Sequence, residues 1–122
     1  VDGSANNRIE GNRFEQVEFG GIYLYRNCGE GGTVRHQSPQ GNLIMGNHFD
    51  TEALRFRANA IWIGSRNGQR TYCHLDDGFP FGSSVDNRDF ADRNTVKGNS
   101  FTDDRSGSNV RDDGQGNTVS IE

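Results

Sequence analysis

The protein has 122 residues, of which 30% are hydrophobic and 17 are glycine, and its 13 basic and 17 acidic residues give a formal net charge of -4. A chain of this length ordinarily makes one domain, and so low an apolar content is near that of disordered chains unless the apolar residues recur at fixed places. The mixture of both charge signs argues against a nucleic-acid partner. No apolar run approaches the roughly 18 residues of a membrane helix, which argues against a membrane-spanning helix.

One short pattern, Asn-x-apolar-x-Gly-Asn-x-Phe, is written three times. The copies are 7–14, 42–49 and 94–101, and a fourth copy starts at 117–121. Their first residues lie 35, 52 and 23 residues apart. A recurrence at such spacings is typical of solenoid proteins. We therefore predict a bare repeat of 23 residues, with insertions in the first two copies.

Each copy is predicted to contain two short strands. Residues 8–10 alternate polar and apolar side chains, and Gly11-Asn12 then favours a turn with positive φ. Residues 21–25 alternate again, with Ile22 and Leu24 on one face and the tyrosines on the other. The counterparts of this second strand are 60–64 and 109–111.

Both insertions follow the second strand, at about 27–40 and 66–93. Equivalent positions in stacked copies lie about 4.8 Å apart. The two inserted loops should therefore emerge side by side on one edge of the molecule.

The corner asparagines, the Gly-Ile-x-Leu strand and the short repeat resemble the right-handed parallel β-helix of pectate-lyase-like enzymes, alginate epimerases and phage tailspikes. The resemblance covers nearly all of the chain outside the insertions. It implies an all-β fold: one domain, 1–122, of about four coils with two loop insertions on one edge. An antiparallel sandwich is the alternative, since short strands and glycine turns also permit it, but equal asparagine offsets argue against a sandwich.

In a stack of coils, equivalent residues form vertical ranks. We expect hydrogen-bonded asparagine ladders and buried apolar stacks. The ladders are Asn7, Asn42, Asn94 and Asn117, and separately Asn12, Asn47 and Asn99; the apolar stacks are Ile9, Ile44, Val96 and Val119, and separately Phe14, Phe49 and Phe101.

The ends of such a stack would expose strand edges, and no capping helix is visible in the sequence. We expect the chain to be a segment of a longer solenoid, or a unit whose open ends pair with another copy or with neighbouring domains.

The two cysteines, Cys28 and Cys73, lie in the two insertions, just beyond strands that we expect to be neighbours. An even count in polar, glycine-rich loops favours a disulfide and a secreted or cell-surface protein. Two unrelated free thiols are the alternative, although a free cysteine is usually buried as a small hydrophobe.

The insertions also hold most of the chemically reactive residues. In the lyases and epimerases that the chain resembles, a base removes the proton beside a uronate carboxylate, which a cation neutralises. We assign His74 and Tyr72 as candidate acid and base with Arg88, although the Asp-Pro-His signature of mannuronan epimerases is absent. Candidate ligand-binding residues are Arg35, Arg70, Asp76 and Asp77 in the loops, and Tyr23 and Trp62 on the strands.

Tyr23 and Trp62 are expected to be outward neighbours on adjacent copies, beside the base of both insertions. They are either a flat platform for a sugar ring or a support for the loops. Leu43 and Met45 also point outward, which suggests a patch covered by a loop or a partner. His48 takes the place of Arg13 in its copy, which favours an ordinary outward side chain.

Two functions remain open. The first is a secreted domain that binds or processes a polysaccharide, as a lyase or epimerase if it is an enzyme; the second is a structural or interaction module. An ice-binding solenoid is a weaker third hypothesis, because ice-binding faces need regular outward ranks of threonine. No cofactor or metal is assigned. Calcium is considered only at Asp103-Asp104 and Asp112-Asp113, and acidic pairs beside glycine are usually solvated turns.

Overall fold

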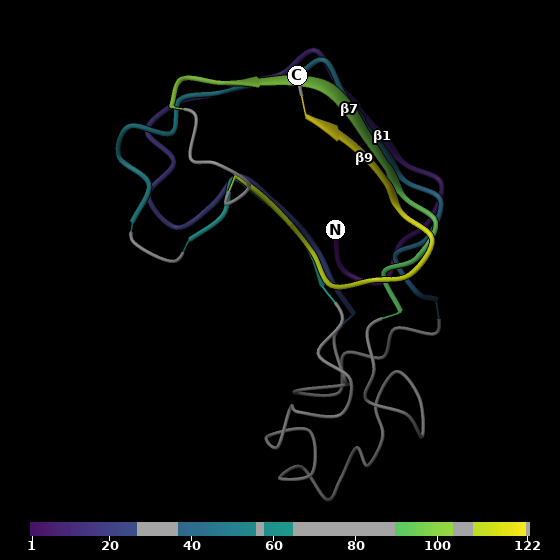
Figure 1. Ribbon diagram of the computed structural model, residues 1–122. Coiled ribbons are helices and arrows are strands. Elements are labelled where there is room, and N and C mark those ends of the chain that lie inside the picture. Colours follow the sequence, from purple (N-terminus) through teal and green to yellow (C-terminus); the bar gives the residue numbers. More distant parts are fainter. Residues whose placement is uncertain (27–36, 56–57, 65–89, 104–108, 122) are drawn as a thin grey trace, which may run out of the picture.

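A computed structural model describes residues 1–26, 37–55, 58–64, 90–103 and 109–121 of the chain (Figure 1). These residues contain strands and turns and no helix. The strands are β1 (Arg8–Glu10), β2 (Arg13–Phe14), β3 (Ile22–Leu24), β4 (Leu43–Met45), β5 (His48–Phe49), β6 (Ile61–Ile63), β7 (Thr95–Phe101), β8 (Val110–Asp112) and β9 (Thr118–Ile121).

The strands form two sheets in which every described ladder is parallel. The first sheet has the order β1-β4-β7-β5-β2, with β9 also paired to β7, and the second has the order β3-β6-β8. Figure 1 shows β1, β7 and β9 on the same side of the molecule; in the sheet, β4 lies between β1 and β7. The predicted all-β class with parallel strands is confirmed. The antiparallel sandwich is wrong, because strands equivalent in successive copies pair directly with one another.

The register of the ladders matches the alignment of the sequence copies. In the first sheet, Ile9 pairs with Ile44 and Ile44 with Val96. In the second sheet, Ile22 pairs with Ile61 and Ile61 with Val110. Equivalent strands of the first three copies therefore lie in the same sheet, and the predicted stacking of equivalent positions is confirmed.

The corner between the two halves of each motif is made by glycine in the left-handed region. Gly11, Gly46 and Gly98 have φ values of 64°, 64° and 62°, where a side chain is disfavoured. The fourth copy has Ile121 at this position and no glycine. The register of the β7–β9 pair shifts at this point, so that Ile121 pairs with Asn99.

The apolar side chains of both sheets meet in one core. Its buried members are Ile22, Leu24, Ile44, Phe49, Ala60, Ile61, Ile63, Ala91, Val96 and Val110, against which Val1, Ile9, Phe14, Phe101 and Val119 pack while partly buried. The phenylalanine stack is confirmed: the ring centroids of Phe14 and Phe49 lie 4.7 Å apart and those of Phe49 and Phe101 lie 5.4 Å apart.

Two asparagine ladders run through the first sheet as predicted. At each step, the backbone N–H and the side-chain Nδ2 of one asparagine donate to the Oδ1 of the next. One ladder joins Asn7, Asn42, Asn94 and Asn117, and the other joins Asn12, Asn47 and Asn99.

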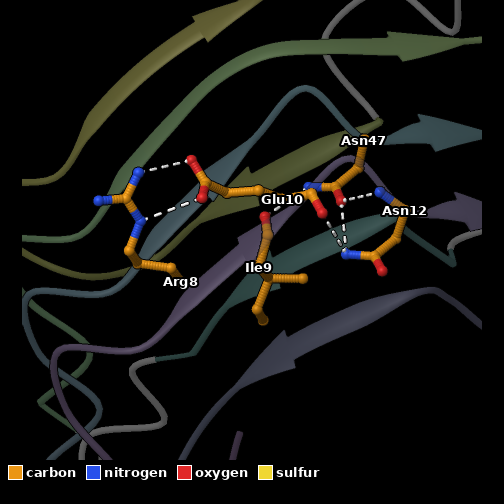
Figure 2. Close-up of polar contacts among 5 residues, drawn as sticks. All are labelled: Arg8, Ile9, Glu10, Asn12 and Asn47. Atoms are coloured by element: carbon orange, nitrogen blue, oxygen red, sulfur yellow. Dashed lines mark hydrogen bonds and ion pairs between the residues drawn. The ribbon is translucent and has the colours of Figure 1, made fainter.

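The buried rungs of the ladders are fully hydrogen bonded. Asn47 is 1% exposed; its Oδ1 accepts from the backbone and side chain of Asn12 at 2.9 and 3.0 Å, and its Nδ2 donates to the carbonyl of Ile9 at 2.8 Å (Figure 2). The same Nδ2 also donates to Asn99 Oδ1 at 3.0 Å. The Asn47 amide therefore links its own copy to both neighbouring copies and leaves no costly unpaired polar group.

Arg8 and Glu10 form a bidentate ion pair on the outer face of β1, with nitrogen–oxygen distances of 2.8 and 3.0 Å (Figure 2). The hydrogen bond from Arg8 lowers the pKa of the Glu10 carboxyl below its usual value. Between this pair and the third copy lie Leu43 and Met45, which are half-buried and outward-facing, as predicted.

We predict that replacement of a buried rung destabilises the fold more than replacement of an exposed rung. Asn47→Ala leaves buried groups on both neighbouring copies unpaired, and should lower the free energy of unfolding by about 2–3 kcal/mol. Asn12→Ala, at an exposed position, is the matched control and should cost less than about 1 kcal/mol. Urea denaturation of both variants measures the difference, and equal costs would contradict the role of the ladder.

The phenylalanine stack gives a second prediction. Phe49 is fully buried between two rings, so Phe49→Ala should lower the free energy of unfolding by about 3–5 kcal/mol. Phe14 is only partly buried and has a ring on one side, so Phe14→Ala should cost clearly less. Thermal unfolding followed by circular dichroism tests the order of the two variants; a Phe14 variant as unstable as the Phe49 variant would argue against the stack.

Candidate functional site

Two of the predicted site residues, Tyr23 and Trp62, belong to the part of the chain that the structure describes. The other predicted residues lie outside it: Arg35, Arg70, Tyr72, His74, Asp76, Asp77 and Arg88. Cys28 and Cys73 also lie outside the described residues. The disulfide, the juxtaposition of the insertions and the roles of these loop residues stay predictions.

Tyr23 and Trp62 are direct neighbours on the outer face of the second sheet. They are Cα partners in the β3–β6 ladder, and each is half-buried between two buried residues of its own strand. Strand alternation requires them to point away from the core. The predicted outward pairing of these two aromatic residues is confirmed.

The two rings are perpendicular rather than coplanar. Their centroids lie 5.6 Å apart with an interplanar angle of 85°, an edge-to-face arrangement that the ring quadrupoles favour. The pair therefore does not form the single flat platform that the sequence suggested. A ligand would contact the face of one ring and the edge of the other.

Hydrogen bonds fix the polar tips of both rings. The Tyr23 hydroxyl donates to the backbone carbonyl of Phe19. The Trp62 indole Nε1 donates to Asp113 Oδ2 at 2.8 Å, and the same carboxylate is ion-paired with Arg111 at 2.8 Å. Phe19, in the turn before β3, thus orients the Tyr23 ring, and Asp113, 51 residues further along the chain, orients the Trp62 ring.

Glycines leave the space that the rings occupy. A Cβ atom on Gly64 would lie 2.9 Å from the carbonyl oxygen of Leu24 and 3.0 Å from Trp62 Cη2. A Cβ atom on Gly20, whose φ is 132°, would meet the Tyr23 ring. Each ring therefore packs against backbone that carries no side chain.

We predict that Asp113 holds the Trp62 ring in place. Asp113→Ala removes the acceptor of the indole N–H, so the ring should become more mobile and more accessible. Acrylamide quenching of fluorescence measures this directly, because Trp62 is the single tryptophan of the chain. Arg111→Ala keeps the acceptor and is the matched control; if it raised quenching as much as Asp113→Ala, the indole hydrogen bond would not be the cause.

The Asp112–Asp113 pair, considered for calcium, is engaged by donors of the chain itself. Asp112 Oδ1 accepts from the backbone of Gly114 at 3.0 Å and from Asn117 Nδ2 at 2.7 Å. Among the described residues, no group of three or more His, Cys, Asp or Glu side chains is arranged to hold a metal ion.

A polar groove lies at the opposite end of the second-sheet strands from the insertions. It has a volume of about 430 Å³ and is lined by Gln16, Glu18, Asp50, Glu52 and Ala53. These residues come from the turns that lead from the first sheet into β3 and β6, whereas the insertions follow those strands. The repeated motif gives no signal for this groove: of the acidic residues that follow the motif phenylalanine in two copies, Asp50 lines the groove and Glu15 does not.

An exposed aromatic ring lies beside the groove. Phe19 is 65% exposed, and the Arg55 guanidinium lies over its ring at 4.6 Å from the centroid. Arg55 also binds the Glu18 carboxylate at 2.8 Å and donates its backbone N–H to the Glu18 carbonyl at 2.9 Å. These contacts fasten the two turns to each other across the adjacent copies.

His48 occupies the outward rank between Arg13 and Ser100, as the sequence predicted. Its Nδ1 lies 2.8 Å from Ser100 Oγ. Both residues stand at regular strand positions on the sheet, so the contact is a cross-strand side-chain pair.

The chain was compared with family models, curated proteins and solved structures, and none of them matches it. No helix formed by the described residues could span a membrane.

Proposed function

We propose that the protein is a secreted or cell-surface domain with the right-handed parallel β-helix fold, of about four coils, that binds a polysaccharide or oligosaccharide. The in-register parallel ladders and the two asparagine ladders support the fold. They are the features by which the sequence resembles pectate-lyase-like proteins.

The observation that carries the proposed binding function is the anchored Tyr23–Trp62 pair on the outer face of the second sheet. Saccharides pack their C–H faces on aromatic rings and direct their hydroxyls to polar side chains, a combination that typical ligand sites provide. Beside Trp62, the carboxylate of Asp113 and the guanidinium of Arg111 supply polar groups.

The insertions would complete the site. They begin just after β3 and β6, which carry Tyr23 and Trp62. We assign Arg35, Arg70, Asp76 and Asp77 to hydrogen bonding with the saccharide from these loops.

Binding is favoured over catalysis as the function. The described part of the site supplies aromatic surface and ion-paired charges, which suit recognition. A lyase or epimerase reaction would assign the acid and base to His74 and Tyr72, with Arg88 neutralising the substrate carboxylate. That chemistry is the second candidate. The lyase or epimerase function would be established if the protein acted on a uronate polymer and the His74→Ala variant did not.

We predict that oligosaccharide binding changes the fluorescence of Trp62. A panel of neutral and uronate oligosaccharides should contain at least one that shifts the emission and binds in calorimetry. Trp62→Ala and Tyr23→Ala should each weaken that binding by about 10-fold, the effect of losing one aromatic contact. Met45→Ala, on the outer face of the first sheet, is the control and should bind like the unmodified protein.

Absence of binding across the whole panel, by fluorescence and by calorimetry, would overturn the proposed function. The alternative, a structural or interaction module whose strand edges pair with another copy or a neighbouring domain, would then be the better account.

A further inference from the structure

A continuous series of contacts leads from the Tyr23–Trp62 pair to the groove at the other end of the sheet. The Trp62 ring contacts the Tyr23 ring, whose hydroxyl donates to the Phe19 carbonyl. Phe19 then contacts Arg55, which binds Glu18, a residue of the groove wall. Phe19 thus contacts both ends of this series, Tyr23 through its backbone carbonyl and Arg55 through its exposed ring.

The charges along this surface are those of an acidic site. Among the residues that the structure describes, the arginines of this surface are Arg55 and Arg111, and each is ion-paired with a carboxylate. The groove wall adds Asp50 and Glu52, together with the amide of Gln16. Carboxylates accept hydrogen bonds from hydroxyl groups and repel anions.

We infer that the binding surface extends from Trp62 past Tyr23 to Phe19 and the groove, and that its ligand is a neutral oligosaccharide rather than a polyuronate. This inference rests on the proposed function. The rings of Trp62 and Phe19 provide stacking surfaces for separate sugar units. The carboxylates of Asp50 and Glu52 accept hydrogen bonds from the hydroxyls of a unit in the groove, and the Gln16 amide can both accept from them and donate to them.

The preference for a neutral chain follows from the paired arginines. A uronate unit in the groove would bring its carboxylate towards Asp50 and Glu52, while the guanidinium of Arg55 is already bound to Glu18. A neutral unit meets no such repulsion. The extension to Phe19 follows from its exposure, because a large apolar side chain with 65% of its surface exposed is unusual in the described part of this chain.

Calorimetry on the 122-residue chain tests the inference. The probes are hexasaccharides of neutral β-linked glucose, mannose and N-acetylglucosamine, a hexasaccharide of galacturonate, and the disaccharide of each neutral sugar. We expect a neutral hexasaccharide to bind at least about 10-fold more tightly than the galacturonate. Phe19→Ala should weaken the binding of the neutral hexasaccharide by about 3- to 10-fold and leave the affinity for the disaccharide of the same sugar unchanged.

Charge variants test the groove directly. The double variant Asp50→Asn, Glu52→Gln should discriminate less strongly against the galacturonate hexasaccharide. Glu15 is exposed and does not line the groove, so Glu15→Gln is the control and should discriminate as the unmodified protein does. Phe19 is largely exposed, so its variant should fold normally, which circular dichroism checks.

The outcomes separate the inference from the proposed function. Tightest binding to the galacturonate, or a Phe19 variant that binds the neutral hexasaccharide normally, would overturn the inference and leave saccharide binding in place. If no oligosaccharide bound at all, both would be lost.

Discussion

The hydrogen bonds of the two asparagine ladders are the constraint on which the rest of the structure depends. A buried amide is costly unless both its oxygen and its nitrogen find partners. Here, Asn42, Asn47, Asn94 and Asn99 are almost fully buried, and each satisfies its amide with the equivalent asparagine of a neighbouring copy and with a backbone carbonyl. A slip of one residue would break every rung and turn the apolar side chains outward. The ladders therefore select one register, which a thin apolar core alone would specify less strictly.

The same register determines what the outer faces present. Because Ile22 and Ile61 must both enter the core in equivalent positions, Tyr23 and Trp62 must both leave it side by side. The copies can therefore differ at their outward positions. The residue of the third copy that is equivalent to Tyr23 and Trp62 is Arg111, which forms an ion pair with the carboxylate that accepts the Trp62 indole hydrogen bond. A repetitive core thus produces a non-repetitive surface, and the surface carries the candidate site.

The sequence predicted the core well and the site only in part, for one physical reason. Ranks such as Phe14, Phe49 and Phe101 follow from periodic spacing, because parallel in-register stacking turns an equal offset into a contact. Trp62 and Asp113 are 51 residues apart and hold different positions in their copies, so no offset predicted their hydrogen bond. The perpendicular ring geometry, the packing of Trp62 against Gly64 and the Arg55–Phe19 contact likewise depend on side-chain rotamers and turn paths. Periodic spacing predicts the backbone position of a residue and the face of the sheet on which it lies, but it does not predict the conformation of its side chain.

The candidate site also shows why fold and ligand must be argued separately. The resemblance to pectate-lyase-like proteins comes from core positions, such as Asn47 and Phe49, whose role is to hold the register. The groove and its rim use residues outside the repeated motif, including Glu18, Phe19 and Arg55. The proposed ligand would contact these outer groups and not the core. In the described part of this surface both arginines are ion-paired while Asp50 and Glu52 line the groove, so the proposed preference for a neutral ligand rests on these outer groups and not on the repeated core.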